Sequence, residues 1–254
     1  MRNIKLTLEY EGTDFCGWQV QPEGRTVQGV LEESLRALFQ KPVKLIGAGR
    51  TDAGVHALGQ VANFTTEMSL HVYQIHRGLN SLLPPDVVVR QVQEVAEKFH
   101  ARYDALHRRY LYCISPQPTA LRRRFVWTVL VPLNLALMRK TAQGLLGTHD
   151  FSGYCLGWGE RPNCRCTVKS VSVNKVKEEI HFQILADRFL RAMVRVIMGR
   201  LVEVGRGHLS RDNFLACLEK GSDQQPIMVA PAQGLCLLEV DYPPAAEHRK
   251  GVRR

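Results

Sequence analysis

The sequence predicts an α+β fold of two similar halves, in which helices pack against a mostly antiparallel sheet. Strand and helix patterns alternate through the first hundred residues, the same rhythm returns more loosely afterwards, and two alternating segments near residue 177 are spaced as a hairpin. We therefore divide the 254-residue chain into an N-terminal half at 1–105, a C-terminal half at 106–244, and a basic tail at 245–254 that we expect to be disordered.

The first half is predicted to contain two successive β-α-β units. Ile4 to Tyr10 alternates apolar and polar residues, as a half-buried strand does. Thr26 is a candidate N-cap for a helix whose apolar residues recur at helical spacing. The expected elements are, in order, a strand at 4–10, a helix at 27–39, strands at 43–46 and 59–65, a helix at 70–82 and a strand at 87–95.

The second half is expected to follow a similar plan. Its most apolar segment, at 189–204, predicts a long buried helix, and Ser210 is a candidate N-cap for a shorter one. The expected elements are, in order, strands at 109–114 and 125–130, a helix at 133–146, a hairpin of strands at 167–175 and 179–185, helices at 189–204 and 210–218, and a strand at 235–240.

Composition indicates a globular protein with an affinity for polyanions. The formal net charge is +10, and cationic side chains release counterions from phosphate backbones, which makes nucleic acid a candidate partner without deciding the matter. No apolar stretch approaches the roughly 18 residues of a membrane span, and the N-terminus has no apolar signal core, so we expect neither a membrane-spanning helix nor export. Seven cysteines without Cys-x-x-Cys spacing predict reduced thiols in the cytoplasm and no metal site.

The segment with the clearest chemical potential is the glycine-rich loop at 47–56, Gly-Ala-Gly-Arg-Thr-Asp-Ala-Gly-Val-His, which follows a predicted strand. Its three glycines permit close approach of other backbone. Arg50 favours the ionised form of Asp52, and an ionised carboxylate can act as a nucleophile. Taken alone, however, an ordinary tight turn with a solvated arginine explains the segment better. It is not a phosphate-binding P-loop, because the Gly-Lys-Ser/Thr ending is missing.

A second segment places three arginines on the predicted apolar helix. Arg188, Arg191 and Arg195 are spaced i, i+3 and i+7, which corresponds to one helical stripe. Because a buried guanidinium needs an anionic partner, we expect at least one of them to meet a carboxylate or to line a cleft for phosphates. The alternative is a helix at the edge of a bundle, with its arginines extending to water.

A third segment combines cationic and aromatic residues on one strand. Tyr110 and Tyr112 share a face by the two-residue period, and Arg108 and Arg109 precede them. Such a combination suits stacking on an unpaired base, although tyrosines on strands more often serve sheet packing. Basic residues at 99–102 and 122–124 add to the positive field.

Taken together, these segments resemble the tRNA pseudouridine synthase A family, collinearly from about residue 4 to 243. The most specific marker is the run from Gly49 to His56. The other markers are Gly17-Trp-Gln19, Gln21-Pro22, Thr26-Val-Gln-Gly29, Leu31-Glu32, Gly59-Gln-Val61, Phe99-His-Ala-Arg102, Arg109-Tyr-Leu-Tyr112, Asp150-Phe-Ser152, Phe189, Met193-Val-Arg195 and Glu203-Val-Gly205.

The resemblance implies isomerisation of uridine to pseudouridine in the tRNA anticodon stem-loop, at about positions 38 to 40. It implies no cofactor and no metal, and a cytoplasmic homodimer in which each tRNA contacts both subunits. For the fold it implies two ferredoxin-like halves that form a continuous, mostly antiparallel sheet flanked by helices, with the active-site cleft between them.

The resemblance also assigns residues. Asp52 corresponds to the nucleophile, Tyr110 to the tyrosine that stacks on the base and takes part in proton transfer, and Arg195 to the arginine that pairs with the aspartate. We expect substrate binding by Tyr110, Arg50, Arg102, Arg188 and Arg191. The sequence departs from close relatives at Ala192, where a polar residue such as histidine is frequent, so the contact made at that position is in doubt.

Three alternatives were weighed. A non-catalytic RNA-binding protein on the same fold has no need of Asp52, Tyr110 and Arg195 together, so their joint presence favours the enzyme. A synthase that acts on other RNA sites is poorly separated by sequence alone. An unrelated metabolic enzyme would need a cofactor motif, which the sequence lacks.

Overall fold

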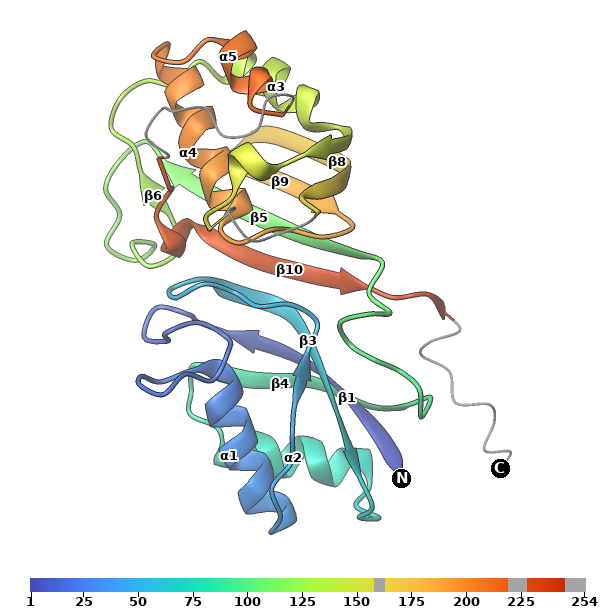
Figure 1. The fold of residues 1–254 in the computed structure, drawn as a ribbon. Coiled ribbons are helices and arrows are strands. Elements are labelled where there is room, and N and C mark those ends of the chain that lie inside the picture. The colour runs from blue at the N-terminus through green and yellow to red at the C-terminus, as the bar shows by residue number, and fades with distance from the viewer. Residues whose placement is uncertain (158–162, 219–227, 245–254) are drawn as a thin grey trace. The chain divides into compact units, whose positions relative to one another are not determined.

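The computed structural model describes residues 1–157, 163–218 and 228–244, which form two compact units (Figure 1). Unit 1 comprises Met1–His107 and the chain from Leu237 on, and unit 2 comprises Arg108–Cys236. The predicted α+β class is confirmed, because the strands form mostly antiparallel pairs and are flanked by helices. The predicted tail at 245–254 lies outside the described residues.

The sheet of unit 1 is centred on two long strands. β1 (Arg2–Tyr10) pairs antiparallel with β3 (His56–Thr66) on one side and with β4 (Val87–Val95) on the other. The short β2 (Ile46–Gly47) also pairs antiparallel with β3, and β10 (Leu235–Asp241) is hydrogen-bonded to β3 as well. The order β4-β1-β3-β2 is that of a ferredoxin-like half.

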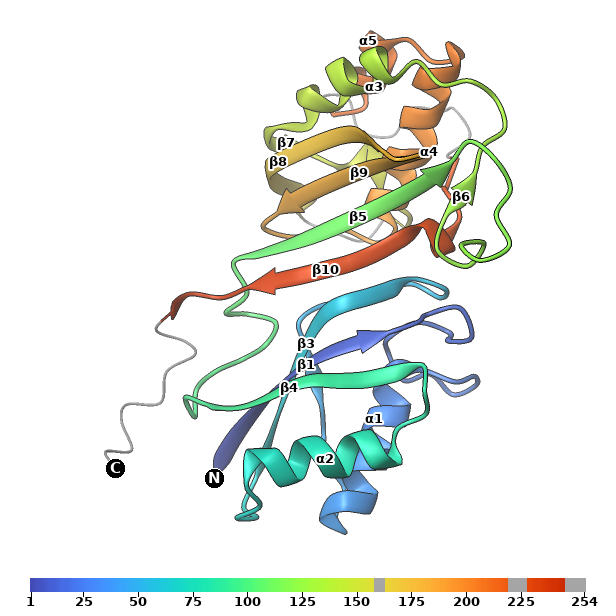
Figure 2. The ribbon, with the colours of Figure 1, turned by 180° about the vertical axis from the view of Figure 1, so that it is seen from behind.

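Two helices cover one face of this sheet (Figure 2). They are α1 (Val27–Phe39) and α2 (Val72–Leu82), and they contact each other. Phe39 of α1 packs edge-on against Phe64, with ring centres 5.6 Å apart. The Thr26 side chain accepts a hydrogen bond from the backbone of Gly29, so the predicted N-cap is confirmed. The periodic apolar residues of α1 therefore face the sheet, as the sequence predicts.

The opposite face of the same sheet is covered by the chain that follows β4. Asn3 donates hydrogen bonds to the backbone oxygens of Ala96, Glu97 and Phe99, the last at 2.7 Å. Because side chains alternate along β1, Asn3 lies on the face opposite to that of its neighbour Ile4. Ile4 is buried and is paired across the strands with Phe64, which packs against Phe39 of α1. Both faces of β1 are therefore buried.

The sheet of unit 2 runs in the order β5-β9-β8-β7. β5 (His107–Ser115) pairs antiparallel with β9 (Glu179–Ala186), and β9 with β8 (Arg165–Val176), which confirms the predicted hairpin. β7 (Gly147–Asp150) adds to β8. The short β6 (Trp127–Thr128) pairs with β5 in parallel, which makes the sheet a mixed one.

Three helices of unit 2 contact one another, namely α3 (Leu135–Ala142), α4 (Met193–Arg206) and α5 (Arg211–Ala216). Short 3-10 turns lie at Gln143–Leu145, Ser152–Tyr154 and Ala232–Gly234. When the short strands β6 and β7 are left aside, the chain order β5-α3-β8-β9-α4 repeats the order β1-α1-β2-β3-α2 of unit 1, so the two halves are similar, as predicted. None of the helices in the described ranges is long and apolar enough to cross a membrane.

Three element predictions for unit 2 were wrong in extent. The helix predicted at 189–204 begins only at Met193, because Ala192 adopts a left-handed conformation with φ of 57°. The helix predicted at 133–146 ends at Ala142, where the chain tightens into a 3-10 turn and then enters β7. The strand predicted at 125–130 pairs over two residues only.

Candidate active site

Asp52 lies in the loop between β2 and β3 of unit 1. Its side chain is half-buried, and its backbone oxygen accepts a hydrogen bond from Val55 at 3.2 Å, which closes the loop. Gly54 has φ of 78°, a conformation that glycine adopts without strain. The buried His56 accepts a hydrogen bond at Nδ1 from the backbone of Gly12. The loop is therefore closed on itself and attached to a neighbouring segment.

That neighbouring segment, residues 12–19, binds the loop backbone on both sides of Asp52. Trp18 donates to the backbone oxygen of Thr51 at 3.1 Å, and Gly54 donates to that of Phe15 at 3.3 Å. Gly17 has φ of 95°, and a Cβ atom there would lie 2.7 Å from the backbone oxygen of Thr51. Only glycine fits this approach, so the glycine preceding Trp18 is needed for the loop to be held.

Buried polar side chains of β1 and β3 also hold the loop by hydrogen bonds. The Tyr10 hydroxyl and Thr51 Oγ1 are 2.9 Å apart. Gln60 Nε2 donates to the backbone oxygen of Gly49 at 3.1 Å and to the Tyr10 hydroxyl at 3.4 Å. All three side chains are buried, and buried polar groups carry a large penalty when they lose a partner. Residues 49 and 51 are thus tied to β1 and β3, which are long and well-packed strands.

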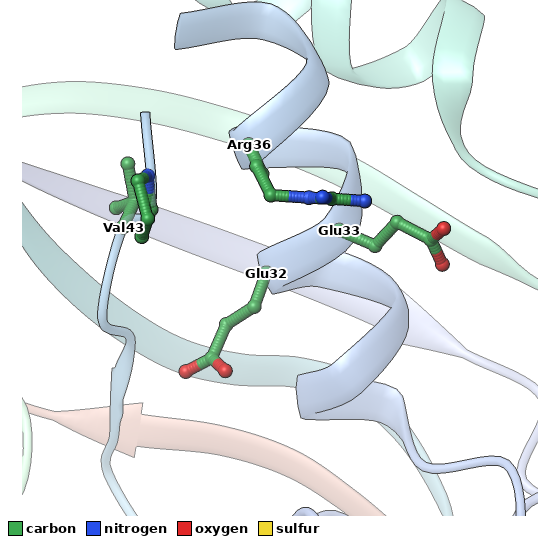
Figure 3. A pocket seen from close by; sticks show the side chains of 5 residues that line it. Glu32, Glu33, Arg36 and Val43 are labelled. Carbon is green, nitrogen blue, oxygen red and sulfur yellow. The ribbon is translucent and has the colours of Figure 1, made fainter. Parts of the chain in front are cut away.

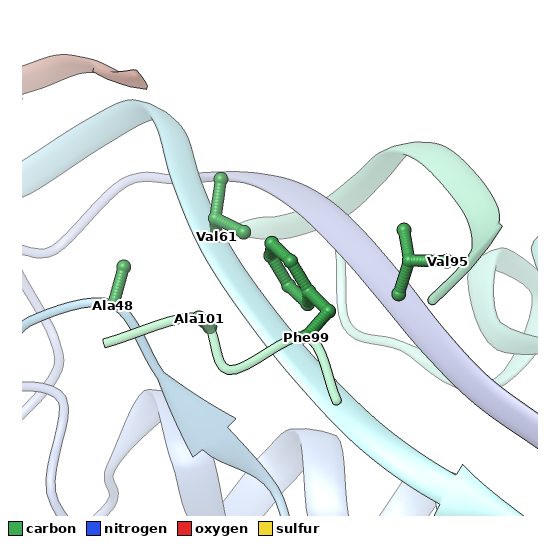
Figure 4. Close-up of a cluster of buried hydrophobic side chains, with 5 residues drawn as sticks. All are labelled: Ala48, Val61, Val95, Phe99 and Ala101. Atoms are coloured by element: carbon green, nitrogen blue, oxygen red, sulfur yellow. The ribbon is translucent and has the colours of Figure 1, made fainter. Parts of the chain in front are cut away.

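The two arginines predicted from unit 1 lie at its surface. Arg50 is exposed, and its Nε donates to the Gln19 side chain at 3.1 Å. Arg102 is also exposed, in the turn that follows Phe99. Ala101, beside Arg102, belongs to the same buried cluster as Ala48 at the start of the Asp52 loop (Figure 4). Within unit 1 the structure therefore brings the Arg102 turn close to the root of the Asp52 loop.

Unit 2 gathers aromatic residues around the first turn of α4. The half-buried Tyr110 ring meets Phe189 edge-on, with ring centres 5.0 Å apart. Tyr112 is buried, and its hydroxyl donates to the backbone oxygen of Pro231 at 2.7 Å. Burial raises the pKa of Tyr112 well above its ordinary value, and the positive charge of Arg195 opposes this. Tyr112 is therefore a neutral packing residue, whereas Tyr110 is only half-buried.

Arg195 lies in the first turn of α4 and is half-buried. Its Nε donates to the backbone oxygen of Ala230 at 2.9 Å, and the Ala230 amide donates to the Arg195 backbone oxygen at 3.0 Å. The first bond restrains the guanidinium group, and the second joins the two backbones. The expectation that an arginine of this segment meets a carboxylate or lines a cleft for phosphates stays a prediction.

Arg188 and Arg191 precede α4, so the predicted single helical stripe of three arginines is wrong. Both side chains are exposed. Arg188 donates to the backbone oxygen of Asn163 at 3.2 Å, and the backbone oxygen of Arg191 accepts from Leu156 at 3.1 Å. The cause is the left-handed turn at Ala192, which separates the first two arginines from the helix.

The predicted site residues are thus divided between the units. Asp52, Arg50 and Arg102 belong to unit 1, and Tyr110 and Arg195 to unit 2, as do Arg188 and Arg191. The ion pair between Asp52 and Arg195, and the cleft that would contain it, stay predictions.

One group of side chains in the described ranges has the composition of a metal site, namely Cys113, Glu179 and His181 of unit 2. The Glu179 carboxylate, however, accepts hydrogen bonds from the Arg122 guanidinium at both oxygens, at 2.9 and 3.0 Å, and another from His181. Burial raises the pKa of the Cys113 thiol to about 11. A guanidinium already supplies the positive charge here and the thiol is protonated, so the group is an ion-pair network.

Two other features, a closely spaced pair of cysteines and a hollow beside α1, also have a structural role. The thiols of Cys164 and Cys166 are both buried, and burial raises the pKa of the Cys166 thiol to about 12. A hollow of about 320 Å³ beside α1 is lined by Glu32, Glu33, Arg36, Pro42 and Val43 (Figure 3). Its Glu32 carboxylate accepts hydrogen bonds from Gln28 and the backbone of Leu45, and so holds the chain leading into β2.

Sequence reasoning gave no role to the residues that brace the Asp52 loop. Tyr10, Trp18 and Gln60 are 42, 34 and 8 positions away from Asp52 in the chain, and their contacts arise only on folding. The available signal was that two of them stand within family markers, Gly17-Trp-Gln19 and Gly59-Gln-Val61.

Comparison with known proteins gives a consistent result. The model of the tRNA pseudouridine synthase family matches residues 7–104 and 141–243. A protein of Exiguobacterium sibiricum named tRNA pseudouridine synthase A is 41% identical over 254 residues, which cover 99% of this chain and 100% of that protein. Proteins of the same name from Geobacter sp. strain M21 and Acetivibrio thermocellus are 44% and 42% identical, and cover 96% and 95% of this chain and all of their own length. The chain therefore belongs to the tRNA pseudouridine synthase family.

Proposed function

We propose that this protein isomerises uridine to pseudouridine in the anticodon stem-loop of tRNA, at about positions 38 to 40, and that it does so in the cytoplasm. The observation that carries the proposal is family membership over nearly the whole chain, together with an intact Gly49–His56 loop. The formal net charge of +10 supports a polyanionic substrate, because phosphate contacts supply much of the affinity for RNA.

The reaction breaks the bond between uracil N1 and ribose C1′ and forms a bond between C5 and C1′. N1 gains a proton and C5 loses one, so no group is consumed and no oxidant is needed. A stacked and paired base cannot rotate in this way, so the uridine must first be flipped out of the helix. In the proposed mechanism Asp52 is the nucleophile, and it attacks either C1′ or the pyrimidine C6.

The environment of Asp52 supports this role. Its loop is braced by backbone hydrogen bonds from residues 12–19 and by the Tyr10 and Gln60 side chains, while its own side chain stays half-exposed. A carboxylate on a rigid backbone loses little freedom when the substrate arrives, which is the advantage of preorganisation.

Unit 2 supplies the other two proposed participants. Arg195, fixed by Ala230, would pair with the Asp52 carboxylate and favour its ionised form. Tyr110, supported edge-on by Phe189, would stack on the flipped base and assist the removal of the proton from C5. Arg50, Arg102, Arg188 and Arg191 are exposed and would contact phosphates. We also propose a homodimer in which each tRNA contacts both subunits.

The decisive experiment compares the wild-type protein with Asp52→Asn on unmodified tRNA, and maps pseudouridine by chemical labelling and primer extension. We expect Asp52→Asn to bind tRNA with unchanged affinity and to form no pseudouridine. Asp212→Asn is the matched control, because its carboxylate is highly exposed on α5, and it should retain full turnover. Appreciable turnover by Asp52→Asn would refute the nucleophile assignment.

The same experiment separates the alternatives. A wild-type protein that binds tRNA without forming pseudouridine would be an RNA-binding protein on this fold. Pseudouridine that appears only outside the anticodon stem-loop would identify a synthase for other RNA sites.

A further inference from the structure

A short turn in unit 1, residues 100–104, is held by four hydrogen bonds. Asp104 Oδ2 accepts from the His100 amide at 2.8 Å, and the Asp104 amide donates to the His100 backbone oxygen at 3.1 Å. His100 Nδ1 accepts from the amides of Arg102 and Tyr103, at 3.2 and 3.3 Å. Because both ends and the middle of the turn are tied together, the side chains that it carries are presented by a fixed backbone.

This turn presents an aromatic ring to solvent. The Tyr103 side chain is 76% exposed. One side of the ring is close to the His100 imidazole, with ring centres 4.3 Å apart and planes inclined by 30°. The Arg102 guanidinium carbon lies 5.8 Å from the ring centre. Because Tyr103 is 76% exposed, His100 and Arg102 leave most of the residue accessible to a ligand, and the neighbouring imidazole limits the freedom of the ring before any ligand binds.

The turn is anchored beside the root of the Asp52 loop. Ala101 is fully buried in a cluster with Ala48 and Phe99, and its amide donates to Asn63 Oδ1 at 2.9 Å (Figure 4). Ala48 begins the loop that carries Asp52. Tyr103 is therefore displayed on the same face of the unit 1 sheet as the start of that loop.

We propose that Tyr103 stacks on an unpaired base of the RNA substrate, while Arg102 contacts an adjacent phosphate. An exposed aromatic ring beside an exposed guanidinium is the combination that binds single-stranded nucleotides, because every base has a face that can stack. The contact binds the RNA and takes no part in the chemical step, and it rests on the proposed function.

The chain contains a matched control for this pair. Tyr73 on α2 is 60% exposed, and the Arg77 guanidinium lies 5.8 Å from its ring centre, the same separation as in the Arg102–Tyr103 pair. Tyr73, however, lies on a helix that covers the opposite face of the sheet from Ala48. A general effect of removing a surface tyrosine beside an arginine would appear at both positions.

The test measures the dissociation constant of full-length unmodified tRNA for the wild type, Tyr103→Ala, Tyr103→Phe and Tyr73→Ala. We expect roughly tenfold weaker binding for Tyr103→Ala, from the effect of removing one stacked aromatic residue. Tyr103→Phe keeps the ring and should bind as the wild type does, as should Tyr73→Ala. At saturating tRNA the turnover number of Tyr103→Ala should be unchanged, with the whole effect in KM.

Salt dependence distinguishes stacking from charge. Replacing Arg102 by Gln should reduce the slope of log affinity against log salt by about 1, as the loss of one phosphate contact does. Tyr103→Ala should weaken binding at every salt concentration and leave the slope unchanged.

Several outcomes would overturn the proposal. Wild-type affinity in Tyr103→Ala would do so, and so would equal losses in Tyr103→Ala and Tyr73→Ala. A change of molar mass in light scattering for Tyr103→Ala, with tRNA affinity intact, would assign the ring to self-association instead. Pseudouridine formation by the wild type is measured on the same samples, so that a failure of the proposed function, with no product, is distinguished from a failure of this inference alone.

Discussion

The buried Tyr10 hydroxyl helps to hold the Asp52 loop, so the substitution Tyr10→Phe has a specific expected effect. The substitution removes one hydroxyl and keeps the ring, which packs beside Trp18 at a centre-to-centre distance of 6.2 Å. The Thr51 hydroxyl, 2.9 Å away and buried, loses a hydrogen-bond partner. Gln60 loses its longer bond to the Tyr10 hydroxyl, at 3.4 Å, and keeps its bond to the backbone of Gly49 at 3.1 Å. The perturbation is therefore concentrated on residue 51, which immediately precedes Asp52.

The expected loss of unfolding free energy follows from the burial of both hydrogen-bond partners. A neutral buried hydrogen bond contributes about 1 kcal/mol net, and a buried group left without a partner costs about 1–3 kcal/mol. We take about 1.5 kcal/mol for Tyr10→Phe, which lowers Tm by about 3–6 °C in a chain of this size. If the same free energy is needed to hold Asp52 in the transition state, kcat falls about tenfold.

The assay combines thermal unfolding with steady-state pseudouridine formation, and Ser34→Ala is the control. Ser34 is also buried in unit 1, and its hydroxyl donates to the backbone oxygen of Val30 at 2.9 Å within α1, on the helical side of the sheet. Both variants lose one buried hydroxyl, but only Tyr10→Phe should lower kcat. Equal kcat values for the two variants would refute the claim that Tyr10 positions the Asp52 loop.

Two further predictions concern packing and pH. A Cβ atom at Gly47 would lie 2.6 Å from the Trp18 indole, whereas a Cβ atom at Gly49 would have no atom within 4 Å. Gly47→Ala should therefore destabilise the fold by about 1–3 kcal/mol, and Gly49→Ala should not. Thermal unfolding measures both variants, and equal Tm values would contradict the prediction. Burial alone would raise the pKa of Glu179, but hydrogen bonds from Arg122 and from a histidine lower it below its ordinary 4.5. The ionised Glu179 carboxylate therefore stabilises the fold above pH 4.5, and this contribution is lost as the pH falls through the lower pKa that Glu179 has in the folded protein. The difference in unfolding free energy between the wild type and Glu179→Gln should then narrow below pH 4.5. A difference that does not depend on pH would disprove the network.

The sequence predicted best the elements that are determined by local signals. The helix at Val27–Phe39 was predicted with its observed bounds, because Thr26 caps it and its apolar residues recur at helical spacing. The strand at Val87–Val95 was likewise predicted with its bounds, since a β-branched run follows Pro84-Pro85. In both cases the residues that begin and shape the element lie within it or directly before it.

The start of α4 could not be predicted in this way. Residues 189–192 are as compatible with a helix as those that follow, and nothing in their types indicates a left-handed residue at Ala192. That conformation costs about 1–2 kcal/mol for a residue with a Cβ atom, so tertiary contacts must impose it. Hydrogen bonds such as that from Leu156 to the backbone oxygen of Arg191 are contacts of this kind, and they join residues 35 positions apart.

The candidate site shows the same division between local and distant causes. Asp52 was found because arginine, threonine and glycine surround it in the chain, and the family resemblance gave the loop its specificity. The groups that hold it in place are spread over β1, β3 and residues 12–19, and no local pattern marks Tyr10 as a partner of Thr51. The sequence thus indicated the proposed nucleophile, whereas the groups that hold its loop became visible only in the structure.

The way in which the loop is held bears on the proposed role of Asp52 as a nucleophile. The hydrogen bonds that the loop makes with residues 12–19, Tyr10 and Gln60 fall on residues 49, 50, 51, 54 and 56, on either side of Asp52. The backbone is therefore restrained, while the carboxylate itself remains half-exposed for a substrate. A longer side chain at residue 52, or the loss of a glycine that lets the two segments approach, would move the carboxylate. We therefore propose that unit 1 contributes to the reaction by holding the Asp52 carboxylate in position.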